Sequence, residues 1–90
     1  MALIEVYGRI GKIVCKMCNL SNTGAFFEII SSNYMPKQND LVQVTINLRT
    51  IKKIHVIYGE VIWCKGLGLG LRFLTSDQFR THLSSKAVNN

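Results

Sequence analysis

The sequence predicts an all-β domain in which six strands form a small barrel or sandwich and one short helix follows at the C-terminal end. Apolar residues recur with a period close to two along almost the whole chain, which is the pattern of half-buried strands. Six such runs, spaced about ten residues apart and separated by turn residues, are typical of small barrels and sandwiches. The last stretch changes to a helical pattern with its own start signal.

The first two predicted strands cover residues 3–9 and 11–18, and Gly8 and Gly11 bracket the turn between them. The polar segment 19–24 then interrupts the apolar pattern. Its Asn, Ser and Thr side chains can bond to nearby backbone groups, and its glycine can adopt a positive φ angle. This segment is therefore predicted to be a structured turn.

The middle of the chain gives three more strands, a loop and a turn. The strands are predicted over residues 25–31, 41–48 and 54–65, the loop over 32–40 and the turn over 49–53. Gly59 is expected to mark a bulge, because the apolar positions change parity across it. The residues expected to share a face are Ala25, Phe27 and Ile29; Val42, Val44, Ile46 and Leu48; Ile54, Val56 and Tyr58; and Val61 and Trp63.

The sixth strand is predicted over residues 66–74, where leucines and glycines alternate. Its apolar face is expected to lie in the core and consists of Leu67, Leu69, Leu71 and Phe73. Its three glycines leave the opposite face bare. Glycine weakens a strand, so this bare face predicts that another backbone, a ring or a helix lies close against it.

A helix is predicted over residues 76–86. Thr75 and Gln78 have the spacing of a capping box at its start. Phe79 and Leu83 lie four residues apart and form a small apolar stripe that is expected to pack on the strands. We expect this helix to plug or cap the barrel.

The composition is that of one globular domain with a basic surface. Residues 1–90 have room for a single core, with strands over about residues 3–74. Eleven Lys and Arg against five Asp and Glu give a net charge of +6, which favours anionic partners. No apolar stretch approaches the roughly 20 residues that cross a bilayer, and the first residues lack signal-peptide features. We therefore expect a cytoplasmic protein without membrane insertion.

The sequence predicts no metal centre, no cofactor and no catalytic set. Cys15 and Cys18 are spaced as C-x-x-C, but positions three apart on a strand face opposite sides, and no second pair of ligands accompanies them. An odd count of cysteines without a secretion signal argues against a disulfide framework. His55 and His82 have no nucleophile at a suggestive spacing, so we expect no enzymatic activity.

Two parts of the chain resemble the PilZ domain family. Residues 19–24, Asn-Leu-Ser-Asn-Thr-Gly, fit its (Asp/Asn)-x-Ser-x-x-Gly motif. Residues 59–66 and 68–73 are similar to its closing hairpin, which reads Gly-x-Val-x-Trp and then Gly-hydrophobic-Gly-hydrophobic-x-Phe. The motif, the hairpin and the final helix occur in the family's order and together cover nearly the whole chain.

The resemblance implies a six-stranded antiparallel β-barrel with one short C-terminal α-helix. It also implies a bacterial signalling module linked to cyclic di-GMP, which acts in motility, type IV pili, biofilm formation or virulence. Asn19 and Ser21 fall on positions that bond the guanine of this ligand or order the loop around it, and Gly24 falls where the backbone turns closely. From the residues alone, Asn19 and Ser21 can equally satisfy the backbone of their own turn.

The chain departs from the family at one element. Cyclic di-GMP receptors of the family carry an Arg-x-x-x-Arg element before the first strand, but here Arg9 is followed four residues later by Ile13. Arg9 and Lys12 can offer charge near the ligand, although lysine cannot reproduce the two-pronged grip of arginine on phosphate. Family members that lack the arginines act as protein-binding adaptors. The resemblance therefore implies a protein partner and weak or no direct binding of cyclic di-GMP.

Two alternatives remain open at this point. The chain is a genuine cyclic di-GMP receptor if other basic residues, or an N-terminal arm outside this sequence, replace the arginine pair. It is instead a small basic barrel that binds single-stranded nucleic acid if its aromatic rings stack bases beside Lys and Arg. The nucleic-acid alternative is less favoured, because no strand pair interleaves aromatic and basic residues densely.

Overall fold

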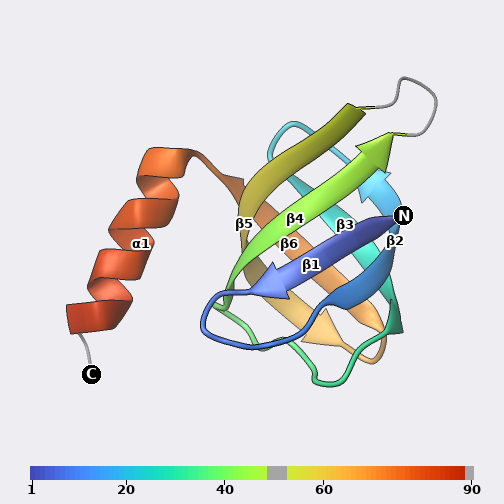
Figure 1. Cartoon of the computed structure of the whole chain (residues 1–90), viewed down its shortest axis with the longest axis horizontal. Helices are drawn as coiled ribbons and strands as arrows, with labels where there is room; N and C mark the ends of the chain where they lie inside the picture. Colours follow the sequence, from blue (N-terminus) through green and yellow to red (C-terminus); the bar gives the residue numbers. More distant parts are fainter. Residues whose placement is uncertain (49–52, 89–90) are drawn as a thin grey trace.

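The structure, a computed structural model, describes residues 1–48 and 53–88 and shows a closed barrel with a helix beside it (Figure 1). The described elements are β1 Ala2–Val6, β2 Ile13–Leu20, β3 Gly24–Ser31, β4 Leu41–Leu48, β5 Lys53–Lys65, β6 Gly68–Leu74 and α1 Ser76–Val88. The strands follow the order β1-β2-β3-β6-β5-β4, and every neighbouring pair is antiparallel. Because β1 pairs with both β2 and β4, the sheet closes on itself. The predicted fold class is confirmed.

The core fills the interior of the barrel, because alternate side chains of each strand point inwards. Its buried members are Ala2, Ile4, Val6, Ile13, Cys15, Phe27, Ile29, Val42, Val44, Ile46, Val61, Leu69 and Leu71. They include the faces predicted for the third and fourth strands, apart from Ala25, which is half-buried and packs against the core. The side chain of Leu48 lies outside the described residues.

The first strand is shorter than predicted. It ends at Val6, and the chain then leaves the sheet through a loop. Gly8 and Gly11 have φ angles of 85° and 116° in this loop, a region that residues with a Cβ atom rarely adopt. The turn marked by these two glycines is confirmed, whereas the predicted continuation of the strand to residue 9 is wrong.

The bulge of β5 lies at Ile62 and not at Gly59. The pairing of β5 with β4 runs through Gly59 without a shift, whereas its pairing with β6 shifts between Val61 and Trp63. Val61 is fully buried but Trp63 is 40% exposed, so the two do not share a face as predicted. The extra residue turns the indole outwards. The predicted turn over residues 49–53 falls outside the described residues except for Lys53, which begins β5.

The apolar face of β6 is narrower than predicted. Leu69 and Leu71 are buried, but Leu67 precedes the strand in the turn and is 61% exposed. Leu67 contributes its carbonyl oxygen, which accepts a hydrogen bond from the Ile29 N–H at 2.7 Å. Phe73 is half-buried rather than part of the core.

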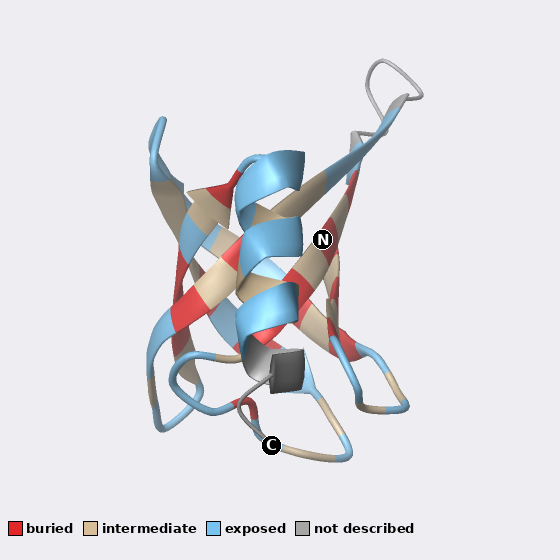
Figure 2. Cartoon of the chain, turned by 90° about the vertical axis from the view of Figure 1, so that its left-hand side faces the viewer, coloured by how far each residue is buried: buried red, intermediate tan, exposed pale blue. Residues whose placement is uncertain are grey.

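The helix α1 begins at the predicted capping box and lies alongside the barrel wall. The hydroxyl of Thr75 accepts the Gln78 N–H at 3.1 Å, and the Gln78 carbonyl oxygen accepts the Thr75 N–H at 2.9 Å. The helix runs past the predicted end to Val88, and Phe79 holds it to the barrel by stacking on Tyr58 at 4.6 Å between centroids. It neither enters nor caps the barrel, which corrects that expectation (Figure 2). No helix among the described residues has the length and apolarity to cross a membrane.

The first two cysteines face opposite sides of the barrel wall, as predicted. Cys15 is buried in the core, whereas Cys18 is exposed. Burial raises the pKa of the Cys15 thiol to about 12. No cluster of side chains suited to holding a metal ion occurs in the described part of the chain.

Candidate functional site

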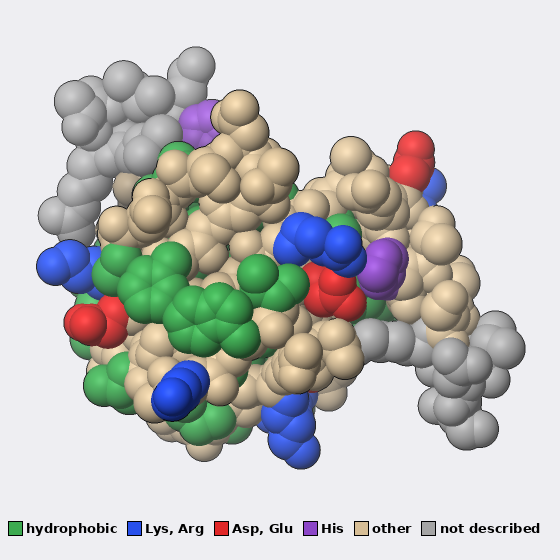
Figure 3. All heavy atoms as spheres, turned by 180° about the vertical axis from the view of Figure 1, so that it is seen from behind, with side chains coloured by type: hydrophobic (Ala, Val, Ile, Leu, Met, Phe, Trp, Pro, Cys, Tyr) green, Lys and Arg blue, Asp and Glu red, His purple; other side chains and the backbone are tan. Residues whose placement is uncertain are grey.

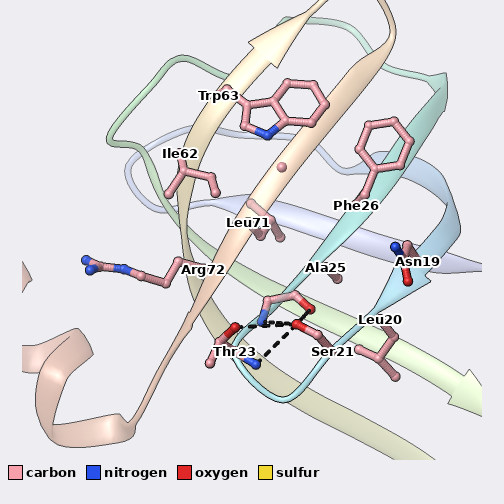
Figure 4. A pocket seen from close by; sticks show the side chains of 12 residues that line it. Asn19, Leu20, Ser21, Thr23, Ala25, Phe26, Ile62, Trp63, Leu71 and Arg72 are labelled. Atoms are coloured by element: carbon pink, nitrogen blue, oxygen red, sulfur yellow. Dashed lines mark hydrogen bonds between the residues drawn. The ribbon is translucent and has the colours of Figure 1, made fainter.

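A pocket of about 410 Å³ lies on the outside of the barrel, where the turn between β2 and β3 meets β5 and β6 (Figure 4). Its lining includes Asn19, Ser21, Gly24, Phe26, Trp63 and Arg72. Three of these residues belong to the predicted loop motif, and Trp63 and Arg72 belong to the predicted closing hairpin. The fold therefore brings the two recognised sequence segments together at one site.

Ser21 holds the turn between β2 and β3 in shape. Its hydroxyl oxygen accepts hydrogen bonds from the N–H groups of Thr23 and Gly24 at 3.3 and 3.2 Å (Figure 4). The same hydroxyl donates to the Gly24 carbonyl at 3.2 Å, and the Ser21 N–H donates to that carbonyl at 2.9 Å. Serine side chains define tight turns in this way. These hydrogen bonds of Ser21 therefore order the loop.

Gly24 is needed because β3 and β6 approach each other closely at this position. A Cβ atom on Gly24 would overlap the carbonyl oxygen of Leu71, and Arg72 lies directly opposite in the strand register. The glycines that have positive φ angles in the described residues are Gly8, Gly11 and Gly66, so Gly24 does not use the positive φ angle that is open to a glycine. Close approach of two backbones explains the glycine instead.

Asn19 lies at the rim of the pocket, near the end of β2. The pairing of β2 with β3 shifts between Met17 and Asn19, and Asn19 then lies opposite Phe26. The side chain is exposed, and no hydrogen bond joins its amide to another part of the described chain. An amide supplies both a donor and an acceptor, which is what the edge of a guanine requires.

Arg72 is a pocket residue that the sequence analysis did not single out. It is the one Lys or Arg of the described residues that lines this pocket. Its Nη2 pairs with Glu60 Oε1 at 2.6 Å, and the other oxygen of Glu60 lies 3.8 Å from His82 Nδ1 on α1. Alternation along the sixth strand was enough to place Arg72 on the outer face. Its position opposite Gly24, however, follows only from the strand register.

Phe26 and Trp63 form an aromatic wall beside the pocket. Their rings stack with centroids 5.2 Å apart and planes 27° apart. Trp63 covers Gly70, where a Cβ atom would overlap the indole, and it also approaches Gly68. This ring confirms the prediction that a group covers the bare glycine face of β6. Hydrophobic side chains gather on the side of the barrel that faces away from the viewer in Figure 1 (Figure 3).

Arg9 and Lys12 do not lie at this pocket. Both belong to the loop before β2, whereas Asn19 lies near the end of that strand, and an eight-residue strand is roughly 25 Å long. Figure 1 shows the β1–β2 loop and the β2–β3 turn at opposite ends of the barrel. The Arg9 guanidinium donates to the Met35 carbonyl at 3.2 Å and lies 5.3 Å from the centre of the Tyr34 ring.

Comparison with known proteins gives a match to a family model. The family model of the PilZ domain matches residues 1–85 of the chain. No curated protein and no solved structure matches the chain. The matched range includes all six strands, the loop motif and most of α1.

Proposed function

The chain belongs to the PilZ domain family of cyclic di-GMP-related signalling modules, and we propose that it acts within that signalling as a protein-binding adaptor. Domains of this family bind ligands and proteins rather than catalyse reactions. In this proposal Asn19, Ser21 and Gly24 form the base-reading part of a nucleotide site that is half complete. Cyclic di-GMP then binds weakly or not at all, and a protein partner carries the signal in a bacterial cell, in pathways such as motility or pilus assembly.

The observation that carries the proposal is the shortage of cations at the pocket. Among the described residues that line it, Arg72 is the one cation, and its guanidinium is already paired with Glu60. A phosphate that bound Arg72 would have to compete with that carboxylate. The sequence contains no Arg-x-x-x-Arg element to supply a second grip.

The size of the deficit can be estimated from the missing bonds. Each hydrogen bond to a charged group contributes about 1.5–3 kcal/mol. The absence of two arginines therefore removes about 3–6 kcal/mol of binding free energy, which corresponds to roughly two to four orders of magnitude in affinity. A dissociation constant in the micromolar range would become roughly millimolar.

Calorimetric titration of cyclic di-GMP into the 90-residue chain tests the proposal. We expect a dissociation constant near or above about 1 mM. Binding in the low micromolar range that is abolished by Asn19→Ala would contradict the adaptor function. Asn33→Ala is the matched control, because Asn33 is also an exposed asparagine but lies in the loop between β3 and β4.

Direct reception of cyclic di-GMP is the second candidate function, and the residues that line the pocket beside Trp63 favour it. The stacked rings of Phe26 and Trp63 and the Arg72 guanidinium line one pocket, which is the combination that holds a nucleotide base beside a phosphate. If this candidate is correct, Arg72→Gln and Trp63→Leu each weaken binding in the same titration. Repeating the titration with a longer chain that includes any upstream arginine pair distinguishes two explanations of weak binding. Tight binding by the longer chain would mean that an N-terminal arm supplies the arginines, whereas weak binding would mean that the pocket itself does not bind the ligand.

The nucleic-acid alternative has a separate test. Stacking on Trp63 would quench its fluorescence when single-stranded DNA or RNA is added, and the affinity would fall steeply as salt is raised. The chain has one tryptophan, so the signal reports on this wall alone. Salt-dependent binding of single-stranded nucleic acid without binding of cyclic di-GMP would support this alternative over both others.

A further inference from the structure

A second cavity, of about 380 Å³, lies where α1 meets the barrel. It shares no lining residue with the pocket around Asn19. Its floor belongs to β1, β4 and β5, and its outer wall includes Phe79 of α1. Figure 2 shows the helix standing across this side of the barrel. This cavity is therefore separate from the pocket around Asn19.

The floor of the cavity is a row of three side chains on adjacent strands. Glu5 of β1 lies opposite Gln43 of β4, and Gln43 lies opposite Tyr58 of β5. Residues directly opposite in antiparallel strands present their side chains on the same face. The neighbours of Glu5, Ile4 and Val6, are buried in the core, so the row points outwards.

The walls of the cavity are aromatic. Phe79 stacks on Tyr58 with centroids 4.6 Å apart and meets Tyr7 edge-to-face at 6.4 Å. The Tyr7 N–H donates to the Leu41 carbonyl at 2.8 Å, which fixes the backbone that carries the ring. Tyr7 is 66% exposed, so much of its ring is open to a ligand.

The chemistry of this lining is complementary to a cation. Aromatic faces attract cations through the ring quadrupole, and the Gln43 amide oxygen and the Glu5 carboxylate accept hydrogen bonds. No ion pair or hydrogen bond engages the Glu5 side chain within the described parts of the chain. Arg9 also lines the cavity, but its guanidinium is engaged by the Met35 carbonyl and the Tyr34 ring. The carboxylate is therefore available to an incoming cation.

We propose that this cavity binds an arginine side chain presented by a protein partner. A planar guanidinium can stack on an aromatic ring and donate in parallel to a carboxylate, which matches the rings and Glu5 more closely than a compact ammonium does. The proposal rests on the adaptor function, for which it names the partner's chemistry. It assigns the partner to the α1 side of the barrel and leaves the pocket around Asn19 to the nucleotide.

Titration of the isotope-labelled full chain by NMR tests this site with a defined probe, N-acetyl-arginine N-methylamide. The matched control probe is the corresponding citrulline compound, which has the same shape without the charge. We expect saturable shifts at Glu5, Gln43, Tyr58 and Phe79, with a dissociation constant of about 1–30 mM for the arginine probe. The citrulline probe is expected to bind at least fivefold more weakly, on the order of the loss of one charge-assisted bond.

Two charge-matched variants complete the test. Glu5→Gln is expected to weaken the arginine probe roughly tenfold. Glu28→Gln removes an exposed carboxylate on β3 and is expected to change nothing. Equal binding of the two probes, an unchanged affinity in Glu5→Gln, or shifts confined to the Asn19 pocket would each overturn the proposal. The readout is independent of cyclic di-GMP, so failure here is distinguishable from failure of the proposed function, which the calorimetric titration of cyclic di-GMP tests.

Discussion

At the scale of single residues, the pocket depends on positions where a side chain is absent. Gly24 lets β3 approach β6, and Gly70 leaves room for the Trp63 indole above the sheet. The Trp63 ring then stacks on Phe26 at the outer face of the sheet instead of entering the core. These two glycines shape the floor and the wall of the site through the absence of a side chain.

The buried thiol of Cys15 gives the first residue-scale prediction, a specific loss of stability at high pH. Burial raises its pKa from 9.0 to about 12, so the unfolded chain releases this proton at a lower pH than the folded chain does. The contribution of Cys15 to stability is therefore unchanged below about pH 9 and falls as the pH rises towards 12, by at most about 1.4 kcal/mol per unit. Urea unfolding at pH 8 and pH 10.5 measures the effect.

The control for this prediction is the Cys15→Ala variant, which is less stable at both pH values but lacks this part of the pH dependence. The comparison is needed because burial also raises the pKa of Cys64. Thiol labelling of the folded protein at pH 8 gives an independent check. Cys18 is exposed and reacts first, whereas labelling of Cys15 at the same rate would show that the core is open.

The burial of a residue could be predicted from the sequence where it follows from the alternation of side chains along a strand. The residues that line the pocket could not, because they depend on the register between strands. Phe27, Leu69 and Leu71 alternate with outward neighbours, so their burial could be predicted. Leu67 continues the same alternation, but the strand begins only after it. Arg72 became a pocket residue because of its partner across the sheet, and a single sequence does not encode that register explicitly.

At the scale of secondary-structure elements, the bulge of β5 decides which side chains face the pocket. One extra residue at Ile62 leaves Val61 in the core and turns Trp63 outwards. The sequence indicates a change of parity in this strand, but glycine was the wrong marker for its position. Gly59 is explained by close packing instead, because a Cβ atom there would lie 3.1 Å from the Arg72 carbonyl oxygen. The pairing of β5 with β6 could be predicted from the family's closing hairpin, whereas the order of the other strands follows only from the structure.

The capping box of α1 gives the element-scale prediction. Thr75→Ala removes the hydroxyl that accepts the Gln78 N–H, and we expect the first turn of the helix to lose about 1 kcal/mol of stability. Faster amide hydrogen exchange at Gln78 and Phe79 measures this loss, while exchange in the barrel stays unchanged. Thr81→Ala is the matched control, because its hydroxyl bonds to the Asp77 carbonyl inside the helix and alanine favours the helix. Equal effects of the two variants would contradict a capping role for Thr75.

At the scale of the whole molecule, the barrel is complete without the helix. The six strands pair with one another around a closed ring, and the buried core of the barrel comes from the strands. The helix attaches through the stacking of Phe79 on Tyr58. It also attaches through the Glu60 carboxylate, which lies between Arg72 and His82. The pocket around Asn19 is lined by residues of the barrel alone, whereas the second cavity has Phe79 of α1 in its wall. The two candidate sites thus differ in whether they require the helix.

Removal of α1 is therefore expected to separate the two sites. A chain that ends at Leu74 should still fold, because the backbone groups of β1 to β6 pair with one another around the closed barrel. It should lose about 1–3 kcal/mol of stability, because the contact of Phe79 with Tyr58 is removed. The Trp63 fluorescence spectrum should stay unchanged, whereas binding of the arginine probe should disappear with the aromatic wall. In the full chain, Phe79→Ala should reproduce the loss of probe binding, which keeps the test valid if the shortened chain is too unstable to measure. An unchanged probe affinity in Phe79→Ala would show that the helix takes no part in this second site.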